Sequence, residues 1–349
     1  MALRSKLQGG FRLLPARDAW LAALPFLPLV ALGAALTHLV DPAQQLAFLA
    51  YDESVYRPQP ARSFVHLGDM LTYYALAGVH VCICLGAAGW FFSRMTRLPA
   101  AQRTRAFRFL RTALLILVPL VLFYVIFADD SVIVQLGFKA TCVALETARL
   151  PTALSGAGCF APGGISTLTL LAWIPTFSGM GAALFAAACA DGSVTNLPSR
   201  TEPNWQAALD GRIRTLERSV YVLSAVLVSS TITITLFARL PLGLFPDGSA
   251  LAGAMSAYVV GLSTFWGGLF TLTLLATFAG PAWQLLRHAE GKGAWRTADA
   301  GVEAAPDLGA WLQEHVFVTV KRQFGNIVSL LAPLLVGPLS SLLSSLTGG

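Results

Sequence analysis

The sequence predicts an all-α protein that crosses a membrane several times, and three observations lead to this class. Only 12% of the residues are charged and 55% are hydrophobic, whereas roughly a quarter of the residues of a soluble domain are charged. The mean hydropathy is +0.65. Six charge-poor runs are long enough, at about 1.5 Å per helical residue, to cross a hydrocarbon core of about 30 Å.

These six runs define the predicted transmembrane helices of a bundle that occupies residues 1–288. They are residues 19–40, 70–93, 112–128, 166–190, 219–238 and 249–286. The last two runs are joined by Arg239 to Gly248, whose prolines and glycines predict the turn of a helical hairpin. Residues 289–349 are predicted to form a polar linker followed by amphipathic helices.

The distribution of basic residues predicts the orientation of the chain. With a cytoplasmic N-terminus, 19 of the 24 Lys and Arg residues fall in inside segments, as the positive-inside rule requires. We therefore expect a multi-pass protein of a bacterial-type inner membrane with its N-terminus in the cytoplasm. The first run lacks a small-x-small cleavage site in the expected place, so we interpret it as a signal anchor.

The net charge of +6 is explained by this topology and does not indicate specific nucleic-acid binding. The segment with the highest density of basic residues, 94–111, carries six arginines, and Phe107, Phe109 and Leu110 are interleaved with the last of them. This spacing predicts an amphipathic helix at an anionic inner leaflet. The expected partners are therefore lipid headgroups, together with a second copy of the chain or another membrane or cytoplasmic protein.

Three further segments have predicted structures. Small residues from Ser178 to Cys189 predict a close contact between the fourth span and a neighbouring helix. Residues 203–218 predict a helical stalk that continues into the fifth span, with the end of the last span, through Trp283 and Leu286, packed against it. Residues 326–346 are apolar but interrupted by two prolines, which favours an interfacial or re-entrant helix. A seventh span is the alternative.

Polar side chains inside the predicted spans are the first candidate site. His80 lies deep in the second span, where even a neutral imidazole needs a hydrogen-bond partner, and we favour a single interhelical hydrogen bond. Hydroxyl groups form stripes on the last two spans, and they can bond across the pair or line a narrow polar path. The hydroxyl residues are Ser224, Thr231, Thr235, Ser263 and Thr264.

A second candidate site lies at the outer ends of the first three spans, where imidazoles and carboxylates share one depth. Such groups can bind a divalent metal ion, and the alternative is that polar residues simply collect at helix ends. The residues are His38, Asp41, His66, Asp69, Asp129 and Asp130. Cys142 and Cys159 are predicted in one outer segment, where an oxidising periplasm favours a disulfide between them.

Several catalytic motifs are missing from the sequence, including a Walker A loop, G-x-S-x-G, H-E-x-x-H and C-x-x-C. We therefore favour a non-enzymatic membrane component, either a partner-docking subunit or an oligomer that forms a pore. One alternative is a transporter for a small uncharged solute that uses the hydroxyl stripes. Another is a membrane enzyme or metal protein that uses the outer His/Asp cluster. The sequence indicates no particular cofactor.

Overall fold

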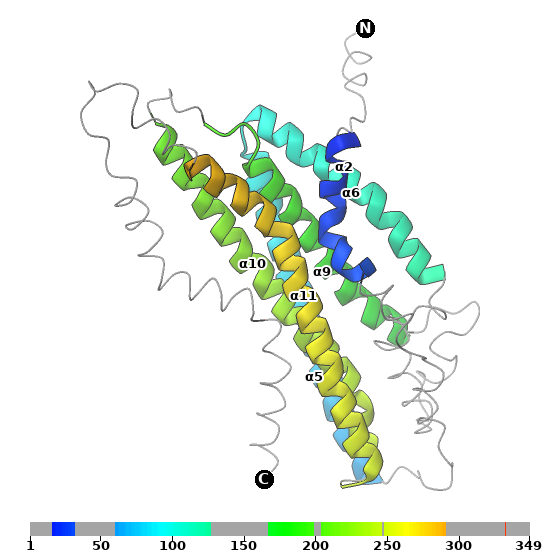
Figure 1. The fold of residues 1–349 in the computed structure, drawn as a ribbon. Coiled ribbons are helices and arrows are strands. Elements are labelled where there is room, and N and C mark those ends of the chain that lie inside the picture. The colour runs from blue at the N-terminus through cyan, green and yellow to red at the C-terminus, as the bar shows by residue number, and fades with distance from the viewer. Residues whose placement is uncertain are drawn as a thin grey trace, which may run out of the picture.

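The structure is a computed structural model that describes residues 16–31, 60–126, 167–198, 204–245 and 248–290, together with Ala332. The described residues are all-helical (Figure 1). The α-helices are α2 (Ala16–Ala23), α5 (Pro60–Thr96), α6 (Ala100–Ile126), α9 (Thr167–Ser193), α10 (Trp205–Arg239) and α11 (Ala250–Glu290). Two short 3-10 helices are also described, η1 (Leu24–Phe26) and η4 (Leu240–Leu244).

Four helices are long and apolar enough to cross a membrane. Their apolar stretches are Leu67–Thr96, Ile174–Ser193, Ala207–Gly243 and Ala252–Leu285. They correspond to the second, fourth, fifth and sixth predicted spans, so a multi-pass membrane protein is supported. The first and third predicted spans lie only partly within the described residues, so the count of six spans stays a prediction. The amphipathic helices predicted in residues 289–349 also lie almost entirely outside the described residues.

The first apolar run is helical over residues 16–31, with a 3-10 turn at Leu24–Phe26. Pro25 lies in that turn, where its missing N–H group disturbs the regular α-helical bonding. Phe26 is nevertheless buried, because η1 lies against α11 and α9. The predicted remainder of this span, residues 32–40, is outside the described residues.

The basic segment and the third predicted span form one continuous helix, α6, rather than two elements. The turn before it comes at Pro99, because proline disfavours a helical conformation of the preceding residue and suits the start of the next helix. Between Ala100 and Pro119 no residue breaks the helix. The helix predicted over the basic segment is confirmed for residues 100–111, whereas Arg94 lies in the last turn of α5 and Arg97 in the turn that follows. The membrane limits of the third span stay a prediction.

The stalk and the hairpin agree with the sequence. Helix α10 runs without interruption from Trp205 to Arg239, with Leu209 and Leu216 buried. After η4, the hydroxyl of Ser249 accepts a hydrogen bond from the N–H group of Ala252 (3.1 Å) and caps α11. At the far end of α11, Leu285 is buried in one cluster with Leu209 and Leu216 of the stalk. Trp283 is 59% exposed and the side chain of Leu286 lies outside the described residues, so their packing against the stalk stays a prediction.

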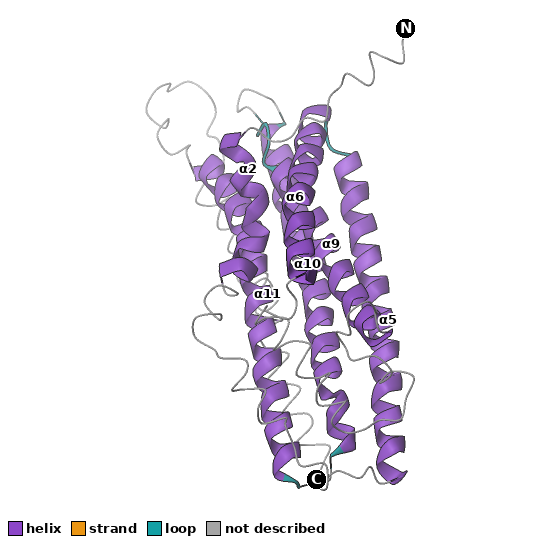
Figure 2. Ribbon diagram, turned by 90° about the vertical axis from the view of Figure 1, so that its right-hand side faces the viewer, coloured by secondary structure: helices purple, strands orange, loops and turns teal. Residues whose placement is uncertain are grey.

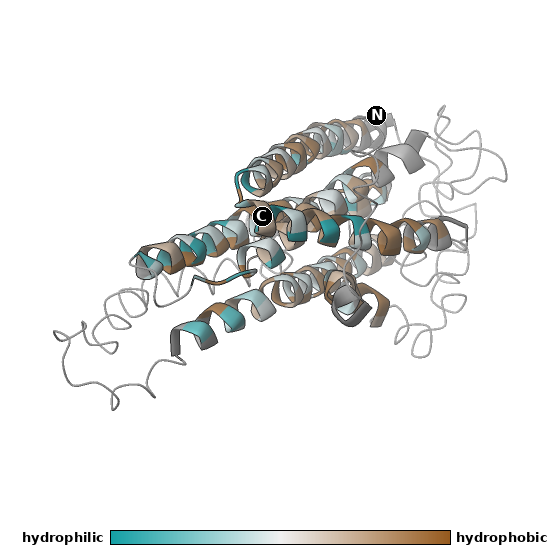
Figure 3. Cartoon of the chain, turned by 90° about the horizontal axis from the view of Figure 1, so that it is seen from above, coloured by the Kyte–Doolittle hydropathy of each residue, from teal (hydrophilic) through white to brown (hydrophobic). Residues whose placement is uncertain are grey.

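The helices form an elongated bundle (Figures 1 and 2). Helix α5 packs on α9 and α10, α10 on α11, and α6 on α9 and α2. One end of the bundle holds the α5–α6 turn, the end of α9, the start of α10 and the end of α11. We call it the arginine end. The α10–α11 turn lies at the other end, next to the start of α5. Apolar and neutral residues predominate along the helices (Figure 3).

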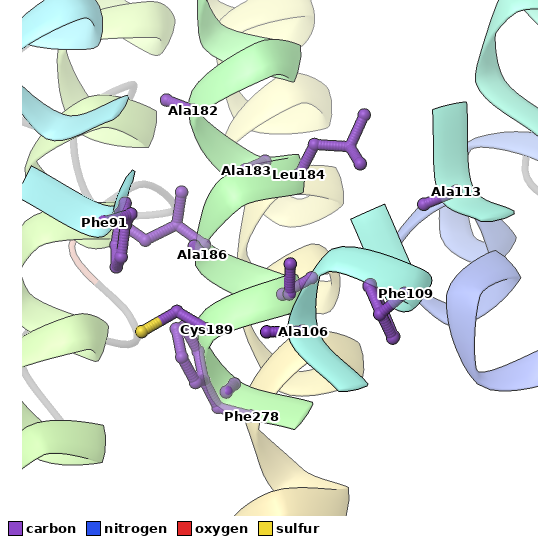
Figure 4. Packing of buried hydrophobic residues seen from close by; sticks show 14 of the residues in the cluster. Phe91, Ala106, Phe109, Ala113, Ala182, Ala183, Leu184, Ala186, Cys189 and Phe278 are labelled. Atoms are coloured by element: carbon purple, nitrogen blue, oxygen red, sulfur yellow. The ribbon is translucent and has the colours of Figure 1, made fainter. Parts of the chain in front are cut away.

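The core is centred on the alanine-rich half of α9, which confirms the predicted close contact. Ala182, Ala186 and Cys189 are buried between α5, α6 and α11 (Figure 4). Among the described glycines, the tightest position is Gly192, where an added Cβ atom would lie 2.8 Å from the Cβ atom of Ala106 and 3.3 Å from the carbonyl oxygen of Gln102. Small residues therefore let α6 pack directly against the backbone of α9.

Candidate functional site

The buried side of α5 places His80 inside the bundle. Buried residues recur along this helix at spacings of three and four, which puts them on one face toward α9 and α10. They are Tyr73, Ala77, His80, Cys84, Ala87 and Phe91. His80 is only 2% exposed, and it lies within the apolar stretch Leu67–Thr96. Its ring nitrogens must therefore find partners on neighbouring helices.

Each ring nitrogen of His80 contacts a different helix. Nδ1 lies 2.8 Å from the hydroxyl oxygen of Ser229 on α10, and Nε2 lies 3.2 Å from the carbonyl oxygen of Pro175 on α9. The hydroxyl oxygen of Ser230 is 3.5 Å from Nε2. Because a carbonyl oxygen can only accept a hydrogen bond, Nε2 carries a proton and donates it to Pro175. His80 thus joins three helices, instead of the single interhelical bond that we favoured.

Gly179 provides the space in which the imidazole sits. A Cβ atom at this position would lie 3.2 Å from the Ser230 hydroxyl and 3.7 Å from Nε2 of His80. One residue earlier, the hydroxyl of Ser178 donates to the same Pro175 carbonyl oxygen at 2.8 Å. The local sequence from Pro175 to Gly179 therefore forms an acceptor next to an open position, and the His80 ring occupies that position.

Cys84, one helical turn after His80, packs its sulfur over the imidazole ring. The sulfur is 3.4 Å from Nε2 and 3.7 Å from Nδ1. A sulfur atom nearly equidistant from both ring nitrogens lies over the ring, not along the lone pair of either nitrogen. This geometry is a packing contact of a small apolar side chain, and it does not chelate a metal ion between the thiol and the imidazole.

The hydroxyl stripes of α10 and α11 are buried in part, and their hydrogen bonds stay within each helix. Thr231 and Thr235 donate to the carbonyl oxygens of Leu227 and Thr231, and Ser263 and Thr264 both donate to Val260. Thr264 is exposed, whereas the other three are buried. Ser224 is also buried, with 4% of its surface exposed. The hydrogen bonds that the structure shows for Thr231, Thr235, Ser263 and Thr264 thus remain within their own helices, and the bridging and polar-path interpretations stay predictions.

The outer metal cluster and the cysteine pair cannot be placed. His38, Asp41, Asp129, Asp130, Cys142 and Cys159 lie outside the described residues, and the side chain of His66 does too. Asp69 is half-buried on the first turns of α5. Within the part of the chain that the structure describes, no group of three or more His, Cys, Asp or Glu side chains could hold a metal ion. Both interpretations stay predictions.

An ion pair at the arginine end was not anticipated from the sequence. Arg105 on α6 donates to both carboxylate oxygens of Asp191 on α9, at 2.8 and 3.2 Å, and Asp191 is 8% exposed. Nearby, the guanidinium of Arg212 donates to the carbonyl oxygens of Ser193, the last residue of α9, and of Thr195 and Asn196, which follow it. A carboxylate at the end of the fourth span, on the same side as the basic segment, was the available signal.

Comparison with known proteins finds no matching protein family, curated protein or solved structure. The candidate sites are consequently judged on their own geometry.

Proposed function

We propose that this protein is a non-enzymatic, multi-pass component of a bacterial-type inner membrane that assembles with a second copy of itself through α5. The observation that carries the proposal is a row of small residues on the outward side of that helix. The row consists of Gly68, Ala75, Cys82, Gly86 and Gly89, all exposed. We call it the small-residue row.

Small residues are unusual choices for a lipid-facing surface. Large apolar residues flank the row, among them Leu71, Val79 and Leu85, which are 61%, 52% and 64% exposed. Gly68, Gly78, Gly86 and Gly89 of α5 have nothing within 4 Å of an added Cβ atom. Each glycine costs a helix about 1 kcal/mol relative to alanine, and close packing against another helix in the membrane would offset that cost.

The spacing of the row suits a second copy. Gly68, Ala75, Cys82 and Gly89 are each seven residues apart, the period at which two helices stay in contact while crossing at about 20°. Two copies in one membrane share an orientation, so a two-fold axis along the membrane normal places α5 beside α5 in parallel. Each residue near the axis then faces its own counterpart.

We expect Cys82 to form a disulfide with Cys82 of the second copy when membranes that contain the protein are treated with a mild oxidant. A variant that retains only Cys82 should migrate as a dimer on a non-reducing gel, because counterparts at the axis bring their Cβ atoms to the roughly 4 Å that a disulfide needs. The matched control retains only Cys84, which is buried against His80 and should remain monomeric.

Two glycine substitutions separate specific association from chance collision. Gly86→Leu places a large side chain on the small-residue row and should reduce the cross-linked fraction several-fold. Gly261→Leu is the matched control, because Gly261 on α11 is also exposed with open space around it, and it should leave cross-linking unchanged. Equal cross-linking in both variants, or dimers of the Cys84-only variant, would contradict the proposal.

The proposed orientation, with a cytoplasmic N-terminus, is supported by the charges of the described helices. Most of their arginines lie toward the arginine end, namely Arg94, Arg97, Arg103, Arg105, Arg108, Arg111, Arg212, Arg214 and Arg218. Arg239 and, by its place in α5, Arg62 lie toward the other end. The positive-inside rule then assigns the arginine end to the cytoplasm, where exposed Arg97 and Arg103 meet anionic headgroups.

Labelling of single cysteines tests this orientation. In a variant whose five native cysteines are replaced by alanine, Arg97→Cys should react with a membrane-impermeant maleimide only after bacterial cells are opened. Arg239→Cys should react in intact cells, because it lies toward the opposite end of the bundle. Labelling of Arg97→Cys in intact cells would contradict the proposed orientation of the chain in the membrane.

A further inference from the structure

The hydrogen bonds around His80 need a definite number of protons. Three short contacts form a chain: Nε2 to the carbonyl oxygen of Pro175 at 3.2 Å, Nδ1 to the hydroxyl oxygen of Ser229 at 2.8 Å, and that hydroxyl oxygen to the carbonyl oxygen of Val226 at 2.8 Å. Each contact is a hydrogen bond only if one proton lies in it. The chain therefore has room for three protons.

A neutral imidazole cannot fill this chain. The neutral ring carries one proton and the Ser229 hydroxyl carries one, so one of the three contacts lacks a proton. With the ring proton on Nε2, the Ser229 hydroxyl donates to Nδ1 and no longer to Val226, whose carbonyl oxygen still accepts from the Ser230 hydroxyl at 3.0 Å. A ring protonated on both nitrogens fills all three, because Nδ1–H then donates to Ser229 and the Ser229 hydroxyl donates to Val226.

The surroundings of the ring are oxygen-rich and contain no nearby formal charge among the described residues. The titratable groups on the same side of α5 are the Cys84 thiol and, two turns away, the Tyr73 phenol. The residues that meet the ring from α9 and α10 are Pro175, Gly179, Ser229 and Ser230. The nearest charged residues along these three helices, Asp69, Asp191, Glu217 and Arg239, are each at least about 13 Å away along the helix axis.

We propose that His80 is a proton-binding site in the interior of the membrane, with the Ser229 hydroxyl and the Pro175 carbonyl oxygen as the acceptors of its two ring N–H groups. The proton comes from the aqueous phase, and the neutral ring becomes an imidazolium with a charge of +1. Removal from water disfavours this charge, whereas hydrogen bonds from a charged donor are roughly twice as strong as neutral ones. Proton uptake would thus tighten the contacts of α5 with both α9 and α10.

The proposal is tested by nitrogen NMR of ¹⁵N-histidine-labelled full-length protein in lipid nanodiscs, with His80→Asn used to assign the His80 signals. Near pH 8 we expect an unprotonated Nδ1 and a protonated Nε2. As the pH is lowered to about 5, the range in which histidine serves as a switch, the Nδ1 signal should change to that of a protonated nitrogen. An Nδ1 that remains unprotonated over this whole range would overturn the proposal.

Two serine variants test the assigned acceptor. Ser229→Ala removes the oxygen that accepts from Nδ1–H, so the proton affinity of His80 should fall by about tenfold, the equivalent of one pH unit. Ser219→Ala is the matched control, because this hydroxyl is buried on the same helix and donates to Thr215 of its own helix. It should leave the titration unchanged. Identical titrations of Ser229→Ala and the wild-type protein would refute Ser229 as the acceptor. If Ser229→Ala does not fold, the wild-type titration alone decides.

Discussion

Gly192→Ala is expected to destabilise the bundle by about 2–3 kcal/mol, the upper part of the range for overpacked cores. The added Cβ atom would lie 2.8 Å from the Cβ atom of Ala106, 3.1 Å from Cδ1 of Leu98 and 3.3 Å from the carbonyl oxygen of Gln102. Two of these atoms belong to the backbone or to a side chain without torsional freedom. Relief therefore requires α6 to move away from α9.

The measurement is equilibrium unfolding in mixed micelles, followed by circular dichroism. Gly181→Ala is the matched control, because it lies on the same helix and has nothing within 4 Å of its added Cβ atom. Alanine there should stabilise the helix by up to about 1 kcal/mol, since alanine is the better helix former. A Gly192→Ala protein as stable as the Gly181→Ala protein would show that α6 does not pack on α9 as described.

Asp191→Ala is expected to cost about 2 kcal/mol. Breaking a fully buried ion pair typically costs 3–5 kcal/mol, and a smaller figure applies here because the Arg105 side chain retains 24% of its exposure and the Asp191 side chain 11%. The loss comes from the half-buried guanidinium, which no longer meets the carboxylate that two of its nitrogens contact.

A second ion pair of the same chain supplies the comparison. Asp210 and Arg214 lie 2.8 Å apart on one face of α10, with side chains 27% and 59% exposed. Removing an exposed helical pair of this spacing costs only about 0.3–0.5 kcal/mol. Asp210→Ala should therefore unfold close to the wild-type midpoint in the same assay. The double variant Arg105→Met/Asp191→Leu should also be more stable than Asp191→Ala, since an apolar pair leaves no half-buried charge. Equal losses in Asp191→Ala and Asp210→Ala would contradict the special role of the first pair.

The membrane class and the helix positions were predictable from the sequence because each depends on residues close together in the chain. A charge-poor run of about 20 residues is a local property, and four such runs coincide with described helices. The stalk was predictable because no proline separates Trp205 from Arg239. The continuity of α6 from the basic segment into the third predicted span was not predicted, although arginines at a membrane surface do not interrupt a helical backbone that they share with an apolar run.

The partners of His80 were not predictable, although its burial was. Pro175 and Ser229 lie 95 and 149 positions from it in the sequence, and no local pattern indicates which helices meet at that depth. The same limit applies to Arg105 and Asp191, 86 positions apart. The hydroxyl stripes show a different limit, because serine and threonine in a helix can satisfy their hydroxyls on the preceding turn and the sequence does not indicate which of them do so.

By itself, the sequence predicted an all-helical membrane protein and the positions of its long apolar helices, since these follow from composition and local spacing, and four described helices are long and apolar enough to cross a membrane. The tertiary structure alone decided which side of each helix faces inward. The buried side of α5 carries His80 and its outward side carries the small-residue row, and both sides are apolar in sequence. In lipid the hydrophobic effect does not distinguish a buried side from an exposed one, so hydrogen bonding and close packing between distant segments make that choice.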